Sequence, residues 1–142
     1  MRTVRQVMAG KGGGVYWVAP DDPVLEAIRQ MAERHVGALA VMRGDELVGI
    51  VSERDYARKV VLMGRKSTET TVGTIMSTPV IQVGPAHTVN ECMQLMTDKR
   101  IRHLPVVENG KLVGVVSIGD LVKAVIDEQK HEIEDLRRYI AG

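Results

Sequence analysis

The sequence predicts a mixed α/β fold of the α+β type, in which two repeated β-α-β-β-α units pack about a pseudo-twofold axis. The main observation is an internal repeat: a shift of 65 residues aligns residues 15–60 with residues 80–125 without a gap. About fifteen of these roughly forty-six positions are identical. A heptad pattern of apolar residues continues past the second copy and predicts an extended C-terminal helix. Two related clefts between the units are the natural places for ligands.

Each unit begins with a short apolar run that predicts a strand, at residues 15–19 and 80–83. A helix follows in each. Asp22 and Pro23 predict an N-cap with proline in the first turn, and residues 88–91 of the second copy have capping-box spacing. The helices place apolar residues on matching faces, which are Val24, Ala27, Ile28 and Met31 in the first copy and Val89, Cys92, Met93 and Met96 in the second.

Two strands joined by a turn complete each unit before its second helix. The turns are predicted at residues 43–46 and 108–111, and the Asn109-Gly110 pair is a strong hairpin signal. Residues 64–71 are polar and join the units. We therefore expect a first unit at residues 1–66, a second at 67–126 and a helical extension at 127–142. Because about 60 residues are marginal for independent folding, both halves should fold as one body.

The last helix is expected from about residue 117 to residue 140. Its apolar residues are spaced 4, 3, 4, 3 and 4 apart with one polar interruption, in the series Val122, Ile126, Gln129, Ile133, Leu136 and Ile140. This seam could pack against the body of the same chain or against a partner helix. Three heptads at the end of a small domain favour the partner helix, and with it a homodimer.

Composition excludes several classes of protein. The formal net charge is +1, and no basic patch with interleaved aromatic residues occurs, so nucleic-acid binding is not expected. No apolar run reaches 18 residues and no signal-peptide segment follows the first residues, so we expect neither a membrane span nor secretion. Cys92 is the single cysteine, which excludes an intrachain disulfide and fits a reducing compartment, by default the cytoplasm.

One motif, Gly-x-x-Ser-x-x-Asp, occurs in register at residues 49–55 and 114–120. Taken singly, the Ser52 and Asp55 pair, or the Ser117 and Asp120 pair, is the signature of a helix capping box. Repetition favours a ligand role as well. The glycine would let a ligand approach the backbone, the helix N-terminus suits a phosphate, and the aspartate can accept hydrogen bonds from a ribose diol. Both interpretations can hold together.

The chain resembles a tandem pair of CBS domains, the arrangement called a Bateman module. Four features carry the resemblance over nearly all of residues 4–126. They are the lead-in segments at residues 4–8 and 72–76, the order of elements, the duplicated motif, and the sequence Arg-Ile-Arg-His-Leu-Pro-Val-Val at residues 100–107. Order, spacing and duplication agree, so the resemblance is specific.

The resemblance implies a regulatory module that binds adenosine-containing ligands between its units. In the family, the aspartate of the motif holds the ribose hydroxyls, the serine lies near the ribose or phosphate, and strand backbone frames the adenine. AMP is the first choice of ligand, with ATP, ADP, NAD(H) or S-adenosylmethionine as alternatives. The regulated protein partner is unidentified.

The family arrangement pairs the motif of each unit with strands of the other. One expected cleft contains Ser52 and Asp55 with Thr78, Val80, Arg102, His103 and Leu104. The other contains Ser117 and Asp120 with Tyr16, Val18, Val36, Gly37 and Ala38. Arg58 and Lys123, one turn beyond each aspartate, are candidate phosphate contacts or simply solvated helix residues. Because Gly37 and Ala38 stand where the second unit has Arg102 and His103, the clefts should be unequal, with phosphate favoured in the first.

Two rival classes remain. An enzyme that turns over a nucleotide is disfavoured, because the sequence has no nucleophile–base pair and its four histidines lack metal-ligand spacing. We therefore expect no catalytic residue, no catalytic cofactor and no metal. Residues 11–14, Lys-Gly-Gly-Gly, are not a Walker loop and are expected to be a flexible lead-in, and Cys92 is expected in the core. The other rival is an interaction scaffold in which the motifs serve only as caps.

Overall fold

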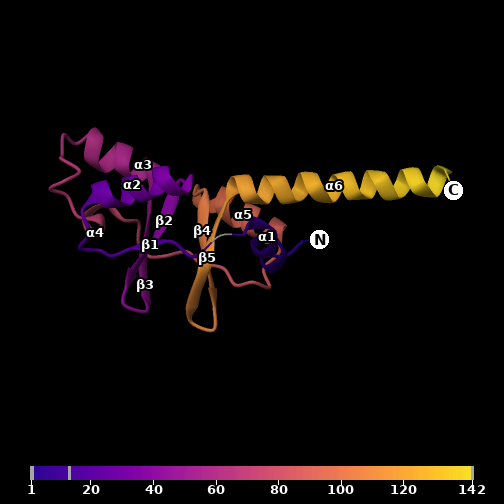
Figure 1. Cartoon of the computed structure of the whole chain (residues 1–142), viewed down its shortest axis with the longest axis horizontal. Coiled ribbons are helices and arrows are strands. Elements are labelled where there is room, and N and C mark those ends of the chain that lie inside the picture. The colour runs from indigo at the N-terminus through magenta and orange to yellow at the C-terminus, as the bar shows by residue number, and fades with distance from the viewer. Residues whose placement is uncertain (1, 13, 142) are drawn as a thin grey trace.

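Two hairpin-centred units lie side by side, and one long helix leaves the second unit along the longest axis of the molecule (Figure 1). The computed structural model describes residues 2–12 and 14–141. Its elements are α1(Val4–Lys11), β1(Trp17–Val18), α2(Val24–Arg34), β2(Ala38–Arg43), β3(Glu46–Ser52), α3(Glu53–Tyr56), the π-helical turn η1(Ala57–Val61), α4(Val72–Ile75), α5(Val89–Lys99), β4(His103–Glu108), β5(Lys111–Ser117) and α6(Ile118–Ala141). The α+β class and the two repeats are confirmed.

Each unit is built on an antiparallel hairpin with equivalent register. Ala38 pairs with Ser52 in β2–β3, and His103 pairs with Ser117 in β4–β5. The turn at Asn109 and Gly110 has positive φ at both residues, 52° and 76°, so the predicted tight hairpin is confirmed. Both hairpins carry a register shift at the same place, which gives the two units similar twist.

The first strand differs between the units. In the first unit β1 runs parallel to β2, but in the second unit the expected strand at residues 80–83 is reduced to one parallel bridge between Val83 and Val106. Val83 N donates to Pro105 O at 3.0 Å, and Val107 N donates to Val83 O at 2.9 Å. Pro79 and Pro85 bracket this run and have no N–H to extend the ladder.

The two predicted helix caps have different outcomes. Thr88 and Glu91 form the expected capping box at α5. The prediction for Asp22 is wrong, because Pro23 occupies the N-cap with extended backbone and the Asp22 carboxylate accepts a hydrogen bond from Ala19 N at 2.9 Å. The first N–H of α2, at Val24, donates instead to Thr70 O at 2.8 Å. A loop carbonyl therefore satisfies the group that a side chain was expected to satisfy.

The predicted apolar helix faces form the cores. Val24, Ala27 and Met31 of α2 are buried, and so are their counterparts Val89, Cys92 and Met96 of α5. Ile28 and Met93 are partly buried at the edges of the same clusters.

The lead-in helices cross between the units. Val4 and Val7 of α1 belong to the core cluster of the second unit, whereas Val72 and Ile75 of α4 belong to that of the first. Each core is therefore completed by the segment that precedes the other unit along the chain. This exchange joins the two halves, as their small size requires, and the boundaries expected at residues 66/67 and 126/127 stay a prediction.

Helix α6 confirms the predicted C-terminal helix. It begins after Ser117, packs against α5 and α1 through its first turns, and then projects away from the body (Figure 1). Packing of the whole seam against its own chain is ruled out, because every residue from 129 to 141 is exposed. Of the helices described, including this one, none is long and apolar enough to cross a membrane.

Candidate functional site

Two cavities lie between the units and share three lining residues, Gly37, Ala38 and His103. We call the cavity that contains Asp55 the Asp55 cleft and the one that contains Asp120 the Asp120 cleft. Their volumes are about 620 and 590 Å³, each within the range of small-molecule sites. Each cleft combines the motif of one unit with strand and lead-in residues of the other.

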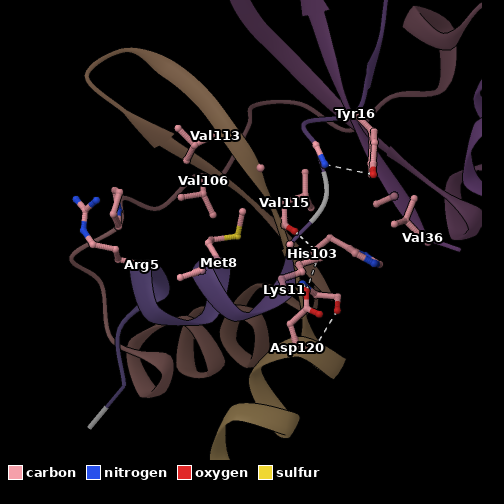
Figure 2. A pocket seen from close by; sticks show the side chains of 18 of the residues that line it. Arg5, Met8, Lys11, Tyr16, Val36, His103, Val106, Val113, Val115 and Asp120 are labelled. Carbon is pink, nitrogen blue, oxygen red and sulfur yellow. Dashed lines mark hydrogen bonds and ion pairs between the residues drawn. The ribbon is translucent and has the colours of Figure 1, made fainter. Parts of the chain in front are cut away.

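Most of the predicted site residues line these clefts. Ser52, Asp55, Arg58, Thr78, Arg102 and His103 line the Asp55 cleft. Ser117, Asp120, Tyr16, Val36, Gly37 and Ala38 line the Asp120 cleft (Figure 2). Four predicted residues, Val18, Val80, Leu104 and Lys123, line neither. Whether any of these residues binds a ligand stays a prediction.

The two strand residues among those four are turned inward. Val18 is 1% exposed and Leu104 is 0% exposed, and each belongs to the core cluster of its unit. Successive side chains of a strand point to opposite faces, so His103 faces the clefts while its neighbour Leu104 faces the core. Their side chains are therefore unavailable to a ligand.

Asp55 is held by four donors of the protein itself. Its Oδ2 accepts from Ser52 N at 2.9 Å and from Ser52 Oγ at 3.1 Å. Its Oδ1 accepts from Ser77 Oγ at 3.1 Å and forms an ion pair with Lys59 Nζ at 3.2 Å. Asp55 N in turn donates to Ser52 Oγ, which completes the capping box of α3. A carboxylate has about four acceptor positions, so the acceptor capacity of Asp55 is filled.

The Asp120 carboxylate accepts fewer hydrogen bonds from the described residues than the Asp55 carboxylate does. Its Oδ2 accepts from Ser117 N at 2.9 Å and from Lys11 Nζ at 2.8 Å, while Oδ1 carries neither contact. Asp120 N donates to Ser117 Oγ at 3.1 Å, so the serine caps the first turn of α6. The Asp120 side chain is also more exposed than that of Asp55, at 23% against 10%. Of the two motif aspartates, Asp120 is the better placed to accept hydrogen bonds from a diol.

Lys11 reaches into the Asp120 cleft from the end of α1 (Figure 2). Besides Asp120, its ammonium donates to Val115 O at 2.8 Å. The expectation of a flexible lead-in is therefore wrong for Lys11, which two hydrogen bonds hold against the second unit. Gly13, in the middle of that segment, lies outside the described residues.

Lys11 also stabilises the charged form of Asp120. Burial acts to raise the pKa of Asp120, but the hydrogen bond from Lys11 and those from Ser117 outweigh it and leave the pKa below its ordinary value. Asp120 is therefore a carboxylate at neutral pH, available to accept hydrogen bonds rather than to donate one.

His103 stands between the clefts. Its imidazole lies against Gly37, where a Cβ would come within 3.2 Å of Nε2, so the glycine makes room for the ring. Burial lowers the pKa of His103, and the positive charges of Lys11, Arg102 and Arg54 lower it further against the opposing effect of Asp120. The ring is therefore neutral at pH 7 and offers a hydrogen bond rather than a charge.

The Asp55 cleft is the more basic of the two. Its lining contains five basic and two acidic side chains, which are Arg54, Arg58, Lys59, Arg100 and Arg102 against Glu53 and Asp55. The Asp120 cleft is balanced, with Arg5 and Lys11 against Glu108 and Asp120. Within residues 2–12 and 14–141, Arg58 and Arg102 form no ion pair. The expected inequality of the clefts is thus present in their charge.

The glycine of each motif packs closely against a methionine of a lead-in segment. A Cβ on Gly49 would collide with the side chain of Met76, and one on Gly114 with the side chain of Met8. A methionine of a lead-in segment fills the space that a side chain would occupy at each glycine, although Gly114 also lines the Asp120 cleft. That a ligand approaches these glycines stays a prediction, and close packing against the crossed lead-ins is a structural reason for a glycine at each position.

Sequence reasoning missed the lead-in residues that line the clefts. Ser77 follows α4 and contacts Asp55, whereas Lys11 ends α1 and contacts Asp120. Both lie outside the 65-residue shift, because the lead-ins are offset by three further residues. Aligning the lead-ins separately, Met8 on Met76, places Ser77 on Ala9 and Lys11 on Pro79, so the repeat carries no signal for either residue.

The remaining candidates for reactive chemistry are the thiol of Cys92 and groups of metal-ligating side chains. Cys92 is fully buried, and burial raises the pKa of its thiol, so it is a core residue as predicted. Among the described residues, no group of three or more His, Cys, Asp or Glu side chains is arranged to hold a metal ion.

Comparison with known families gives a direct match. The family model described as the CBS domain matches residues 4–62 and residues 72–127. The CBS domain-containing protein CBSX3, mitochondrial, of Arabidopsis thaliana is 44% identical over 149 residues, covering 99% of this chain and 72% of the relative.

Solved structures agree. A protein with CBS domains from Burkholderia ambifaria MC40-6 is 52% identical, with a TM-score of 0.84 over 89% of this chain and 96% of that one. A hexameric CBS-CP12 protein from bloom-forming cyanobacteria is 26% identical, with a TM-score of 0.77 over 99% of this chain and 88% of that one.

Proposed function

The chain belongs to the CBS-domain family as a tandem pair, and from this premise we propose that it is a non-catalytic regulatory module that binds an adenosine-containing nucleotide, AMP first. The observation that carries the proposal is the composition of the two clefts. Each brings a motif aspartate at a helix N-terminus to strand residues of the other unit. The Burkholderia ambifaria relative is described as a candidate signal-transduction protein, which is compatible with a regulatory role.

The roles within each cleft follow from the contacts. Asp120, whose Oδ1 has no hydrogen-bond donor among the described residues and whose pKa lies below its ordinary value, is proposed to accept both ribose hydroxyls. The adenine would lie near Tyr16 and Val36, whose side chains provide apolar and aromatic surface. In the Asp55 cleft, Arg58 and Arg102 are proposed to bind phosphate, because both are exposed cations without an ion-pair partner in the described part of the chain.

Isothermal titration calorimetry of the natural chain with AMP tests the proposal, with ADP, ATP, NAD⁺, NADH and S-adenosylmethionine as competitors. We expect AMP to bind, and Asp98→Asn, an exposed change on α5 outside both clefts, to bind it unchanged. If none of these ligands gives a binding signal, the chain is a scaffold whose motifs are only caps. If chromatography after incubation shows a nucleotide converted, the module is an enzyme.

We propose that the module works as a homodimer. The support is the uncovered apolar seam of α6, and the cyanobacterial relative is described as hexameric. Light scattering should give twice the chain mass for the natural protein. Ile133→Asp together with Leu136→Asp should give a monomer of unchanged fold by circular dichroism, since both residues are exposed in the single chain. A monomeric natural protein would contradict the dimer.

The regulated partner and the compartment belong to the same proposal. We propose an unidentified protein partner and, because the lone cysteine is reduced and buried, a reducing compartment such as the cytoplasm. The Arabidopsis relative is named as mitochondrial, so cell fractionation with an antibody to this chain is the relevant measurement.

A further inference from the structure

The outer part of α6 has no neighbour in its own chain. Every residue from 129 to 141 is exposed, and the helix points away from both units (Figure 1). An isolated helix of about 12–15 residues is marginal in water, because helices in proteins gain most of their stability from packing. The seam residues are large and apolar, with 45% of Ile126, 50% of Ile133, 61% of Leu136 and 83% of Ile140 exposed. This surface therefore needs a partner.

The seam has the composition of a two-stranded coiled coil. Its 3–4 spacing places Ile126, Ile133 and Ile140 at the first core position of the heptad, position a. Val122, Gln129 and Leu136 fall at the second core position, d. Isoleucine at every a position, together with leucine at one of the three d positions, favours two parallel strands over three or four. The chain thus selects a pair of helices rather than a larger bundle.

The charged residues beside the seam favour a second copy of the same helix in parallel orientation. Position e carries Lys123, Lys130 and Arg137, and position g carries Val125, Glu132 and Tyr139. In a parallel pair of identical helices, g of one faces the following e of the other, so Glu132 meets the partner's Arg137. In an antiparallel pair, e faces e, and basic residues would face basic residues along the whole seam. A second copy in parallel orientation therefore gives Arg137 an oppositely charged partner and keeps the basic residues at e apart.

Gln129 gives an independent indication of register. In a parallel pair without axial shift, each Gln129 faces the partner's Gln129, and the two amides can donate and accept hydrogen bonds. In an antiparallel pair, Gln129 would lie opposite Ile133 or Leu136, and its amide would be buried without a partner. A single polar residue in a core position is a known way to fix the register of such helices.

We propose that α6 pairs with α6 of a second copy as a parallel, in-register, two-stranded coiled coil from Val122 to Ile140. The twofold axis then runs along α6, and both bodies stand at the N-terminal end of the coiled coil with corresponding units at the same height. Since Asp120 lies two residues before Val122, the Asp120 clefts of the two copies adjoin the start of the shared seam. This inference rests on the homodimer proposed above but not on nucleotide binding.

Cysteine cross-linking tests the orientation. Ile140→Cys places a thiol near the C-terminal end of the seam, where a parallel pair brings the two thiols within disulfide reach. An antiparallel pair separates them by about 20 Å or more. Arg138→Cys, two residues away on the outer face of the helix, is the matched control, and the natural chain controls for the buried Cys92. Under oxidised glutathione, Ile140→Cys should cross-link at least about five-fold faster than Arg138→Cys.

A charge exchange tests the predicted pairing. Glu132→Arg should raise the dimer dissociation constant by about two- to ten-fold, and adding Arg137→Glu to it should restore the natural value. A dimer by light scattering in which Ile140→Cys cross-links no faster than Arg138→Cys would overturn the parallel coiled coil and leave the homodimer standing. A monomer would overturn both, and nucleotide titration would still report separately on the clefts.

Discussion

At the residue scale, the aspartates of the two motif copies differ in how many contacts their carboxylates make within the protein. The capping roles of Ser52 and Ser117 were predictable from the sequence, because a Ser-x-x-Asp pair before a helix is a capping signal. The contacts that Lys59 and Ser77 make with the Asp55 carboxylate were not predictable from the sequence. Lys59 has Ala124 as its counterpart in the second unit, and Ser77 lies in a lead-in outside the aligned repeat. Whether an aspartate is open to a ligand therefore depends on residues that the repeat does not share.

Asp55→Asn should mainly destabilise the fold. Asp55 is 7% exposed, and its carboxylate accepts three hydrogen bonds and forms an ion pair with Lys59. An amide in its place can accept fewer hydrogen bonds and loses the charge that Lys59 pairs with. We expect a loss of about 1–3 kcal/mol in the free energy of unfolding, measured by urea denaturation. Asp98→Asn, exposed on α5, should change it by less than about 0.5 kcal/mol. A fully stable Asp55→Asn would show that the four contacts are weak.

Lys11→Met should strengthen adenosine binding. Lys11 and a ribose diol compete for the Asp120 carboxylate, and methionine keeps the apolar stem while removing the competing ammonium. Because the pair is partly exposed, we expect a gain of only about two- to five-fold in affinity, measured by calorimetry. Lys66→Met, an exposed change in the link between the units, is the control. Weaker adenosine binding by Lys11→Met would instead make Lys11 a ligand contact.

At the element scale, the strands, hairpins and long helices follow from local patterns, and the crossing of the lead-ins does not. Asn109-Gly110 and the heptad spacing of α6 are local signals that the structure confirms. The exchange of α1 and α4 depends on contacts between segments far apart in the chain, and periodicity carries no information about them. Met8 and Met76 record this exchange, since each packs against the motif glycine of the unit that its lead-in does not precede.

Gly49→Ala should destabilise the protein through overpacking. The new methyl group would lie 2.5 Å from Met76 Sδ, which forces the methionine and α4 to shift. We expect a loss of about 1–3 kcal/mol in the free energy of unfolding. Met76→Ala should lose less stability in the Gly49→Ala background than in the natural chain, because the two changes then offset each other. Gly10→Ala in α1, with no atom within 4 Å, is the control. Additive effects of the two changes would exclude this contact.

At the scale of the whole molecule, near symmetry of fold coexists with asymmetry of charge. The repeat predicts two clefts, and the replacement of Arg102 and His103 by Gly37 and Ala38 predicts that they differ. Two clefts are present and differ in charge, but of these four residues only Arg102 distinguishes them, because Gly37, Ala38 and His103 line both. The size of the difference was not predictable, because Arg54 and Arg100 join the Asp55 cleft from a helix and a helix C-terminus that only the folded chain brings together.

Arg102→Ala should therefore weaken AMP more than adenosine. Arg102 is an exposed cation of the Asp55 cleft, and only the phosphorylated ligand gives it an anionic partner. A lost charged hydrogen bond costs about 1.5–3 kcal/mol, which corresponds to roughly 12- to 160-fold in affinity for AMP. Lys66→Ala, exposed in the link between the units and outside both clefts, should leave the binding of both ligands unchanged. Equal losses for AMP and adenosine would assign Arg102 a structural role.

The most direct test of the central claim is the discrimination between AMP and 2′-deoxy-AMP by the natural chain, Asp120→Asn and Asp55→Asn. If the motif aspartates hold the ribose, the natural chain should prefer AMP by about five- to 150-fold, the value of a charged hydrogen bond of roughly 1–3 kcal/mol. Asp120→Asn should lose most of this preference while keeping its circular dichroism spectrum. Unchanged preference for AMP in both folded variants would contradict the claim and leave the motifs as helix caps.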